Sequence, residues 1–414
     1  MKKISANKNY KTYLAYFVAA LFLFYEMCLQ VTPSVMAPAI MAELKIGASE
    51  LGWIGGLYFI AYTAMQIPAG HLFDRKQYGY VFLASIIACV IGIRLFSPFL
   101  PYAALASSRV LMGIGSAFAF VSVLVVANRL FPKQHYPLLV GIAQLLAAFG
   151  AMLGGGPVSY LMNTAGIDTT LMSLVLFGLA LTFMSFIFLC QPLKNQLQVE
   201  KNKSPTSLLA NLKSIITNKQ TLWIGLYACL SWTPVACFAE LWGPTYLAEY
   251  HHISITMASS VTSGVWVGLM IGSPCIGLLS LKINLKWLTA TTAFIGFLSS
   301  FCLLHIYMPL ISSYILLFFI GVSSSGQILT FEMIRKLHKS NSLHATATGI
   351  NNMALVAGGI IFQPLIGHVL SAMAQPEWIH QIPHYPVPSY QIALSVIPAC
   401  YLLAFIIALT RFNR

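Results

Sequence analysis

Four polar residues lie within long apolar stretches of the sequence: Glu26, Gln30, Arg109 and Glu240. A charged side chain at the centre of a bilayer costs at least about 2.5–3.5 kcal/mol, so such residues rarely face lipid and usually mark a function. A carboxylate in that position could carry a proton, bind a cationic group of a solute, or form a buried ion pair with an arginine. These interpretations require that the stretches around the four residues cross a membrane.

The composition indicates a membrane protein. Of 414 residues, 58% are hydrophobic and 8% are charged, whereas soluble domains carry about 25% charged residues. Runs of about 20 apolar residues can cross a hydrocarbon core of ~30 Å, and in lipid such runs form helices because every backbone polar group must be paired. Twelve spans are predicted, at 13–42, 50–72, 78–98, 102–130, 137–162, 169–191, 220–249, 256–281, 286–307, 309–334, 342–373 and 388–411.

The basic residues follow the topology of these spans. If the N-terminus is inside, 20 of the 23 Lys and Arg residues lie on the inner side and only Lys45 falls in an outside loop. This asymmetry predicts that both termini are cytoplasmic in an inner (plasma) membrane. The net charge of +13 therefore reflects topology, and we expect no nucleic-acid partner.

The two halves of the chain resemble each other. A displacement of 206–208 residues aligns Pro38 with Pro244, Gly113 with Gly321, and "GIAQLLAAFG" with "GINNMALVAG". A parallel repeat of six helices around a central site is an architecture of secondary transporters. The sequence predicts an all-α membrane protein with two six-helix bundles, 1–191 and 220–414, joined by the polar cytoplasmic linker 192–219.

The loop "GHLFDRKQYGY", between the second and third spans, carries the most diagnostic motif. Its Gly70, Asp74 and Arg75 match a Gly-x-Leu-x-Asp-Arg signature, and the loop resembles that of the major facilitator superfamily. The resemblance implies that this loop latches the cytoplasmic side while the transporter faces outward. The counterpart in the second half, "GSPCIGLLSLK", has Leu281 in place of the aspartate, which would weaken the latch on that side.

Other motifs extend the resemblance over the whole chain. "SSRVLMGIGSA" is similar to the superfamily's Arg-x-x-x-Gly motif through Arg109 and Gly113. "GAMLGGGPVSY" matches the antiporter motif only in part, because Pro157 comes late, and this departure speaks against a drug/proton antiporter. The first two helices and the eleventh look like those of bacterial members related to phagosomal amino-acid and lysosomal dipeptide transporters.

Glu26 and Arg109 fall at matching depths. At 1.5 Å per residue, Glu26 lies roughly 20 Å from the inner edge and Arg109 about 10 Å from the outer edge of a ~30 Å core. The resemblance implies that helices 1, 4, 7 and 10 line a central cavity. We therefore predict that Glu26 faces a watery path and pairs with Arg109, with Gln30 on the same helical face. A purely structural ion pair is the alternative.

Further residues complete the predicted solute or proton pathway. Glu240 aligns with Ser34 under the repeat and could bind a cationic group of the solute or belong to an outer gate. Amides on the fifth and eleventh helices could bind a polar solute or join helices. The remaining predicted site residues are Tyr58, Tyr62, Gln144, Asn351 and Asn352.

The predicted function is alternating-access transport of a small polar organic solute, with an amino acid or short peptide favoured and protons as a candidate coupling ion. The alternatives are an organic-anion or sugar-acid symporter, a siderophore or drug exporter, and a solute receptor that does not transport. No P-loop, no acid–base–nucleophile cluster and no metal-ligand spacing occur in the sequence, so we expect no enzyme activity, no cofactor and no metal. We expect a monomer embedded in the bilayer.

Overall fold

The computed structural model describes residues 6–73, 78–132, 135–190, 215–338, 341–374, 377–379 and 382–412. Eleven helical stretches within these ranges are long and apolar enough to cross a membrane. The second predicted span is the 26-residue helix α2 (Ala48–Phe73). The eleven stretches correspond to the other predicted spans, so each predicted span is a helix or a run of consecutive helices. The predicted bounds are correct to within three residues, except that the first helix begins at Ala6 rather than at 13.

The elements fall into two groups of helices, which we call the N-terminal group and the C-terminal group. The N-terminal group consists of α1 (Ala6–Leu44), α2, α3 (Tyr78–Leu95), α4 (Tyr102–Ser116), α5 (Ala119–Leu130), α6 (Tyr136–Gly154), α7 (Gly156–Ala165), α8 (Ile167–Ser185) and the π-helix η2 (Phe186–Cys190). The C-terminal group consists of α10 (Lys219–Pro234), the π-helix η3 (Val235–Trp242), α11 (Gly243–His251), α12 (Ile255–Thr262), α13 (Gly264–Leu279), α14 (Leu285–His305), α15 (Leu310–Ser324), the 3₁₀ turn η4 (Ser325–Gln327), α16 (Ile328–Leu337), α17 (Asn341–Met373), α18 (Val387–Leu394) and α19 (Val396–Arg411).

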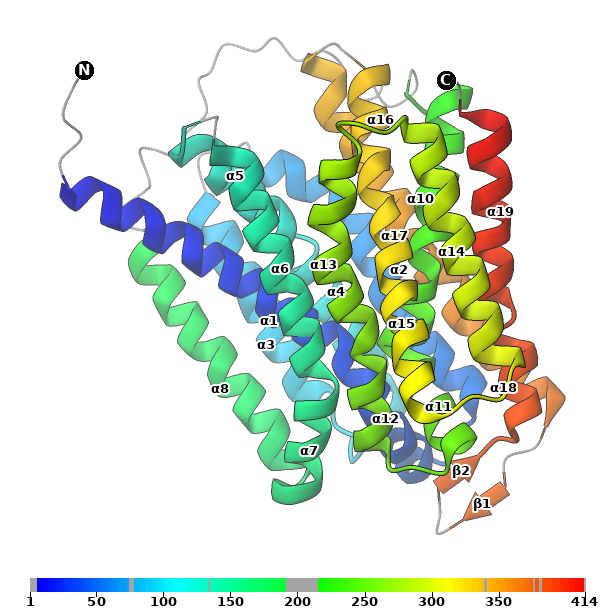
Figure 1. Ribbon diagram of the computed structural model, residues 1–414. Helices are drawn as coiled ribbons and strands as arrows, with labels where there is room; N and C mark the ends of the chain where they lie inside the picture. Colours follow the sequence, from blue (N-terminus) through cyan, green and yellow to red (C-terminus); the bar gives the residue numbers. More distant parts are fainter. Residues whose placement is uncertain are drawn as a thin grey trace.

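One antiparallel hairpin accompanies the helices in the described part of the chain. Its strands are β1 (Glu377–Ile379) and β2 (Ile382–His384), and Glu377 pairs with His384. The hairpin lies at the bottom of Figure 1, whereas α1 begins and α19 ends near the top. The start of the first helix and the end of the last one thus lie at the same end of the molecule, as an even number of crossings requires.

The same turn closes the first membrane span of each group, which is α1 in the N-terminal group and α10–η3–α11 in the C-terminal group. Lys45 after α1 and His252 after α11 have φ angles of 52° and 53°, and they are the two non-glycine residues with positive φ in the described chain. The amide of Ile46 donates to the carbonyl of Met41 at 3.2 Å, and the amide of Ile253 donates to that of Ala248 at 3.1 Å. Both are the six-to-one bond of a helix-ending Schellman turn. The matching positions are 207 residues apart, so the displacement found in the sequence reappears in backbone geometry.

The two groups meet along a seam in which α2 packs against α17, while α6 and α7 pack against α13 and α12. The approach is close at Gly52, where an added Cβ would lie 2.7 Å from the carbonyl oxygen of Gln363. Hydrogen bonds across the seam join the Ala48 amide to the Tyr385 hydroxyl at 2.9 Å, and Ser159 to Thr256 at 2.8 Å. These residues all lie toward the end of the molecule that carries the hairpin, so the seam is closed at that end.

Candidate functional site: a buried polar cluster at the seam

Five of the predicted site residues form one buried cluster. Glu26 and Gln30 come from α1, Tyr58 from α2, Arg109 from α4 and Glu240 from η3. The Tyr58 hydroxyl lies 3.1 Å from Glu26 Oε2 and 3.1 Å from Gln30 Oε1, and Gln30 Nε2 donates to Glu240 Oε2 at 2.8 Å. None of the five side chains is more than 6% exposed, so the contacts are shielded from solvent in this conformation.

A glycine sets the position of Arg109 in the cluster. Gly113 lies one turn after Arg109 on α4, and a Cβ there would come within 2.3 Å of the Tyr58 carbonyl oxygen. Because only a glycine permits this approach, α2 and α4 pack backbone to backbone at Tyr58. The guanidinium carbon of Arg109 then lies 4.5 Å from the centre of the Tyr58 ring, a cation–π contact.

The predicted direct pairing of Glu26 with Arg109 is wrong for this structure. No ion pair of Arg109 occurs among the described residues, and its guanidinium lies over the rings of Tyr58 and Phe96 instead. Tyr58 contacts both residues, with its hydroxyl on the Glu26 carboxylate and its ring under the guanidinium. The helical depths were matched correctly, but the side chain of a third helix connects the two charges.

Three polar atoms of the cluster are buried and lack a protein partner: Arg109 Nε, Arg109 Nη1 and Glu240 Oε1. A buried donor or acceptor left unpaired costs about 1–3 kcal/mol, and more when the group is charged. The cluster thus offers N–H donors from Arg109 and a carboxylate oxygen from Glu240. Such a pair of groups can bind a small molecule with an anionic part and a donor part.

Glu240 links the two groups of helices. It comes from the C-terminal group, whereas its partner Gln30 belongs to the N-terminal group. The alignment of Glu240 with Ser34 predicts a position about two turns outward of Glu26 on α1, whereas its hydrogen-bond partner Gln30 is one turn outward. A hydrogen bond across the seam at this depth must break if the two groups move apart.

The amides extend the cluster only in part. Asn352 of α17 donates to Gln66 Oε1 of α2 at 3.1 Å, again across the seam, and Tyr62 stacks on Tyr58 with ring centres 5.9 Å apart. Asn351 instead donates to Thr330 Oγ1 at 2.8 Å, within the C-terminal group. Gln144 is half-buried on α6 and has no hydrogen bond to the cluster among the described residues.

The charged residues of the predicted cytoplasmic latch lie outside the part of the chain that the structure describes. Gly70 falls in the last turn of α2, but Asp74 and Arg75 lie outside the described residues.

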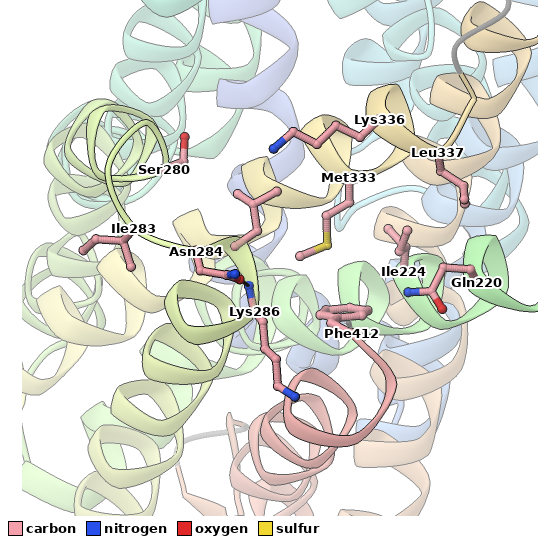
Figure 2. A pocket seen from close by; sticks show the side chains of 11 residues that line it. Gln220, Ile224, Ser280, Ile283, Asn284, Lys286, Met333, Lys336, Leu337 and Phe412 are labelled. Atoms are coloured by element: carbon pink, nitrogen blue, oxygen red, sulfur yellow. Dashed lines mark hydrogen bonds between the residues drawn. The ribbon is translucent and has the colours of Figure 1, made fainter. Parts of the chain in front are cut away.

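A separate cavity of about 420 Å³ lies at the end of the molecule where α19 terminates (Figure 2). Its walls include Ile224, Asn284, Met333 and Phe412, and none of the predicted site residues lines it. Lys286 and Lys336 border it, and in Figure 2 their amino groups do not converge on a common point. This cavity is therefore distinct from the buried polar cluster.

Comparison with known proteins decides the family. The sequence profile of the Major Facilitator Superfamily matches residues 12–409. The chain belongs to the major facilitator superfamily. As a superfamily member it resembles, in fold, the inward-facing and unoccupied structure of a bacterial homologue of the human lysosomal transporter Spinster, with a TM-score of 0.74, 14% identity, and coverage of 99% of this chain and 98% of that one. The nucleoside transporter NupG gives a TM-score of 0.73 at 13% identity, covering 96% and 100% of the two chains.

The relatives found by sequence are similar to this facilitator over only part of its length. The uncharacterized transporter YybO of Bacillus subtilis (strain 168) is 25% identical over 270 residues, 58% of this chain and 60% of that protein. The hexuronate transporter of the same organism is 23% identical over 252 residues, 60% and 59% of the two chains. The riboflavin transporter RibZ of Clostridioides difficile (strain 630) is 23% identical over 171 residues, 41% and 37%. The chain thus spans about 60% or less of these relatives' length.

Proposed function

We propose that this protein is a secondary transporter that moves a small polar organic solute across the membrane by alternating access. The supporting observation is the buried polar cluster at the seam, with polar atoms that lack a hydrogen-bond partner contributed by both groups of helices. In this proposal the bundles 1–191 and 220–414 rock about the linker 192–219, and the protein works as a monomer. Rocking breaks the Gln30–Glu240 contact and opens the cluster to one side at a time.

The geometry of the cluster supports a solute that carries a carboxylate. The unpaired Nε and Nη1 of Arg109 can donate to a carboxylate, the partner that a guanidinium binds best. Glu240 Oε1 can accept from an ammonium group of the same solute. An amino acid or a short peptide has both groups, so this remains the proposed solute class.

A sugar acid is the second candidate, and a specific observation favours it. The hexuronate transporter is among the relatives, and a hexuronate offers a carboxylate for Arg109 and hydroxyl donors for Glu240. The two candidates differ in whether the group that reaches Glu240 is charged. Export of a larger compound and reception without transport are the remaining alternatives.

Ligand-induced stabilisation tests the proposal. The purified protein would be heated with amino acids, dipeptides, hexuronates and neutral sugars, because a ligand raises the midpoint of the state that it binds. We expect a rise with carboxylate-bearing solutes and none with neutral sugars, and the same solute should then enter proteoliposomes. Stabilisation by neutral sugars alone would contradict a role for Arg109 in binding.

Protons are the proposed coupling ion, with Glu26 as their carrier. Glu26 is buried beside Tyr58 and forms no ion pair among the described residues, so a change in its protonation would alter the hydrogen bonds through Tyr58 to Gln30. We also propose that Gly70, Asp74 and Arg75 form the cytoplasmic latch. Asp74→Asn should then slow transport with little loss of folded protein.

The proposed orientation has both termini in the cytoplasm. It follows from the sequence, in which 20 of the 23 Lys and Arg residues fall in the tails and loops predicted to lie on the inner side. Leu281 and Tyr307 flank α14 at opposite ends and are 82% and 86% exposed. An impermeant thiol reagent added outside intact cells should label Tyr307→Cys and spare Leu281→Cys, in a background without the exposed Cys275. The reverse pattern would invert the orientation.

A further inference from the structure

Glu240 lies on an unusual helical segment. Residues Val235–Trp242 form a π-helix, and the amide of Gly243 donates to the carbonyl of Phe238, five residues back. Pro234 and Pro244 flank the segment, and neither has an amide hydrogen to donate to the helical ladder. π-Helical turns are rare and occur frequently at functional sites, because they redirect side chains that a regular helix would point elsewhere.

Gln363 of α17 contacts both ends of this segment. Its Nε2 donates to the Ala236 carbonyl at 2.6 Å, and its own carbonyl lies 3.4 Å from Trp242 Nε1. Ala236 and Trp242 flank Glu240 on η3. Gln363 therefore contacts the π-helical segment on both sides of Glu240.

Gln363 is itself held in place by the N-terminal group. A Cβ on Gly55 of α2 would come within 2.1 Å of Gln363 Oε1, so the amide packs directly on the α2 backbone. Gln363 is 1% exposed and its Oε1 has no protein partner. An apolar side chain of this size would avoid the cost of that unpaired oxygen, so packing alone does not account for a glutamine here.

We propose that Gln363 is a positioning residue, which holds η3 in the π-helical register that directs Glu240 to Gln30. The proposal rests on the proposed role of Glu240 in solute binding. Its physical basis is that a π-helical turn is less stable than the α-helical turn it replaces. The bond from Gln363 to Ala236 stabilises the wider turn from outside.

Hydrogen exchange of the full-length protein in detergent tests the register directly. Gln363→Met keeps the length of the side chain and removes its donor. We expect amide exchange across 235–243 to become at least about 10-fold faster in this variant. Gln391→Met is the matched control, because Gln391 Nε2 likewise donates to a backbone carbonyl of another helix, that of Leu304 at 2.7 Å, outside the cluster. It should leave exchange across 235–243 unchanged.

A double-mutant comparison tests the action through Glu240. Gln363→Met should weaken binding of a stabilising solute about 10-fold in the wild-type background and much less in the Glu240→Gln background, because residues that act as a unit are not additive. Equal losses in both backgrounds, or unchanged exchange across 235–243, would overturn the positioning role. If the wild type binds no carboxylate-bearing solute, the proposed function fails, and the exchange experiment still decides whether Gln363 holds the π-helical register.

Discussion

The two groups of helices share their packing and differ in their chemistry. In the N-terminal group, Gly113 of α4 packs on the carbonyl of Tyr58, and a Cβ added to Gly113 would lie 2.3 Å from that carbonyl oxygen. In the C-terminal group, Gly321 of α15 packs on the carbonyl of Val265, and the corresponding distance from an added Cβ to the carbonyl oxygen is 2.0 Å. The two glycines are 208 positions apart and their partners 207, so the same helix contact was built twice. The duplicated part is thus the backbone arrangement.

The side chains around these contacts differ. Under the repeat, Arg109 corresponds to Leu317 and Tyr58 to Val265, and both residues of the C-terminal group are buried hydrophobes. Conversely, Glu240 corresponds to Ser34, which is buried with an unpaired hydroxyl. Most of the charged cluster therefore belongs to one copy, and the other copy adds a single carboxylate across the seam. In the proposed function, solute binding therefore depends mainly on the N-terminal group, and the Gln30–Glu240 contact depends on the position of the C-terminal group.

The largest effect is expected from Arg109→Met. The change removes the guanidinium and leaves Glu26 and Glu240 buried without a cation nearby, so solute uptake should fall at least ~100-fold in proteoliposomes. Leu317→Met is the matched control at the equivalent position, and it should change uptake less than about 2-fold, since Leu-to-Met changes conserve volume. Equal losses in the two variants would mean that the position matters for packing in both copies and that the charge does not.

Glu26→Gln should separate coupling from binding. If Glu26 carries the proton, uptake driven by a pH gradient is lost, whereas solute exchange without a gradient persists, because exchange need not change protonation. If Glu26 binds an amine of the solute, both modes fail together and affinity falls. Glu50→Gln, at an exposed carboxylate that accepts from the Gly47 amide, is the control and should leave both modes intact. Wild-type behaviour of Glu26→Gln in both assays would exclude it from the pathway.

Much of this comparison could be predicted from the sequence. Hydropathy gave the spans to within three residues for most helices, because lipid imposes one secondary structure on any long apolar run. The depths of Glu26 and Arg109 followed from a fixed rise per residue. The contacts of these two side chains could not be predicted, because the direction in which a side chain points depends on how the helices pack. Here the close packing at Gly113 brings Tyr58 between the two charges.

The role of Gln363 was missed for a related reason. Its partner is a backbone carbonyl in a π-helical turn, and hydropathy does not distinguish that turn from an α-helix. A signal was present in the sequence: Pro234 and Pro244 interrupt the hydrogen-bond ladder ten residues apart within one span. Two interruptions within one span mark a segment whose register can change, and the segment between them contains Glu240.

A smaller effect is expected from Tyr58→Phe, which keeps the ring under Arg109 and removes the hydroxyl between Glu26 and Gln30. The loss of one buried hydrogen-bonding group, about 1–3 kcal/mol, predicts a fall in uptake of roughly 10-fold. The control is Tyr246→Phe in the C-terminal group, whose hydroxyl donates to the Leu303 carbonyl at 3.1 Å. That change should lower thermal stability slightly and leave uptake unchanged. If the two variants behave alike, the Tyr58 hydroxyl serves packing only.

The smallest effect concerns the seam. Gly52 of α2 packs on the carbonyl of Gln363, and its counterpart under the repeat is Ser259, whose carbonyl lies 3.7 Å from a Cβ added to Gly155. The seam thus has two related contacts, and the α2–α17 contact is the tighter one. Gly52→Ala leaves only 2.7 Å between the new methyl group and a backbone oxygen, so it should loosen the closed end of the seam.

We expect Gly52→Ala to change the uptake rate about 2- to 5-fold while the equilibrium affinity for solute changes little, because a single methyl group shifts a packed contact by about 1 kcal/mol. The same substitution at Gly141, where an added Cβ meets nothing within 4 Å, is the control and should have no effect. Thiol labelling at Ser49→Cys, next to the contact, should become faster in the Gly52→Ala variant if the closed end opens more often. Unchanged labelling together with unchanged uptake would mean that this close approach does not govern opening, and that the looser contact at Gly155 deserves the same test.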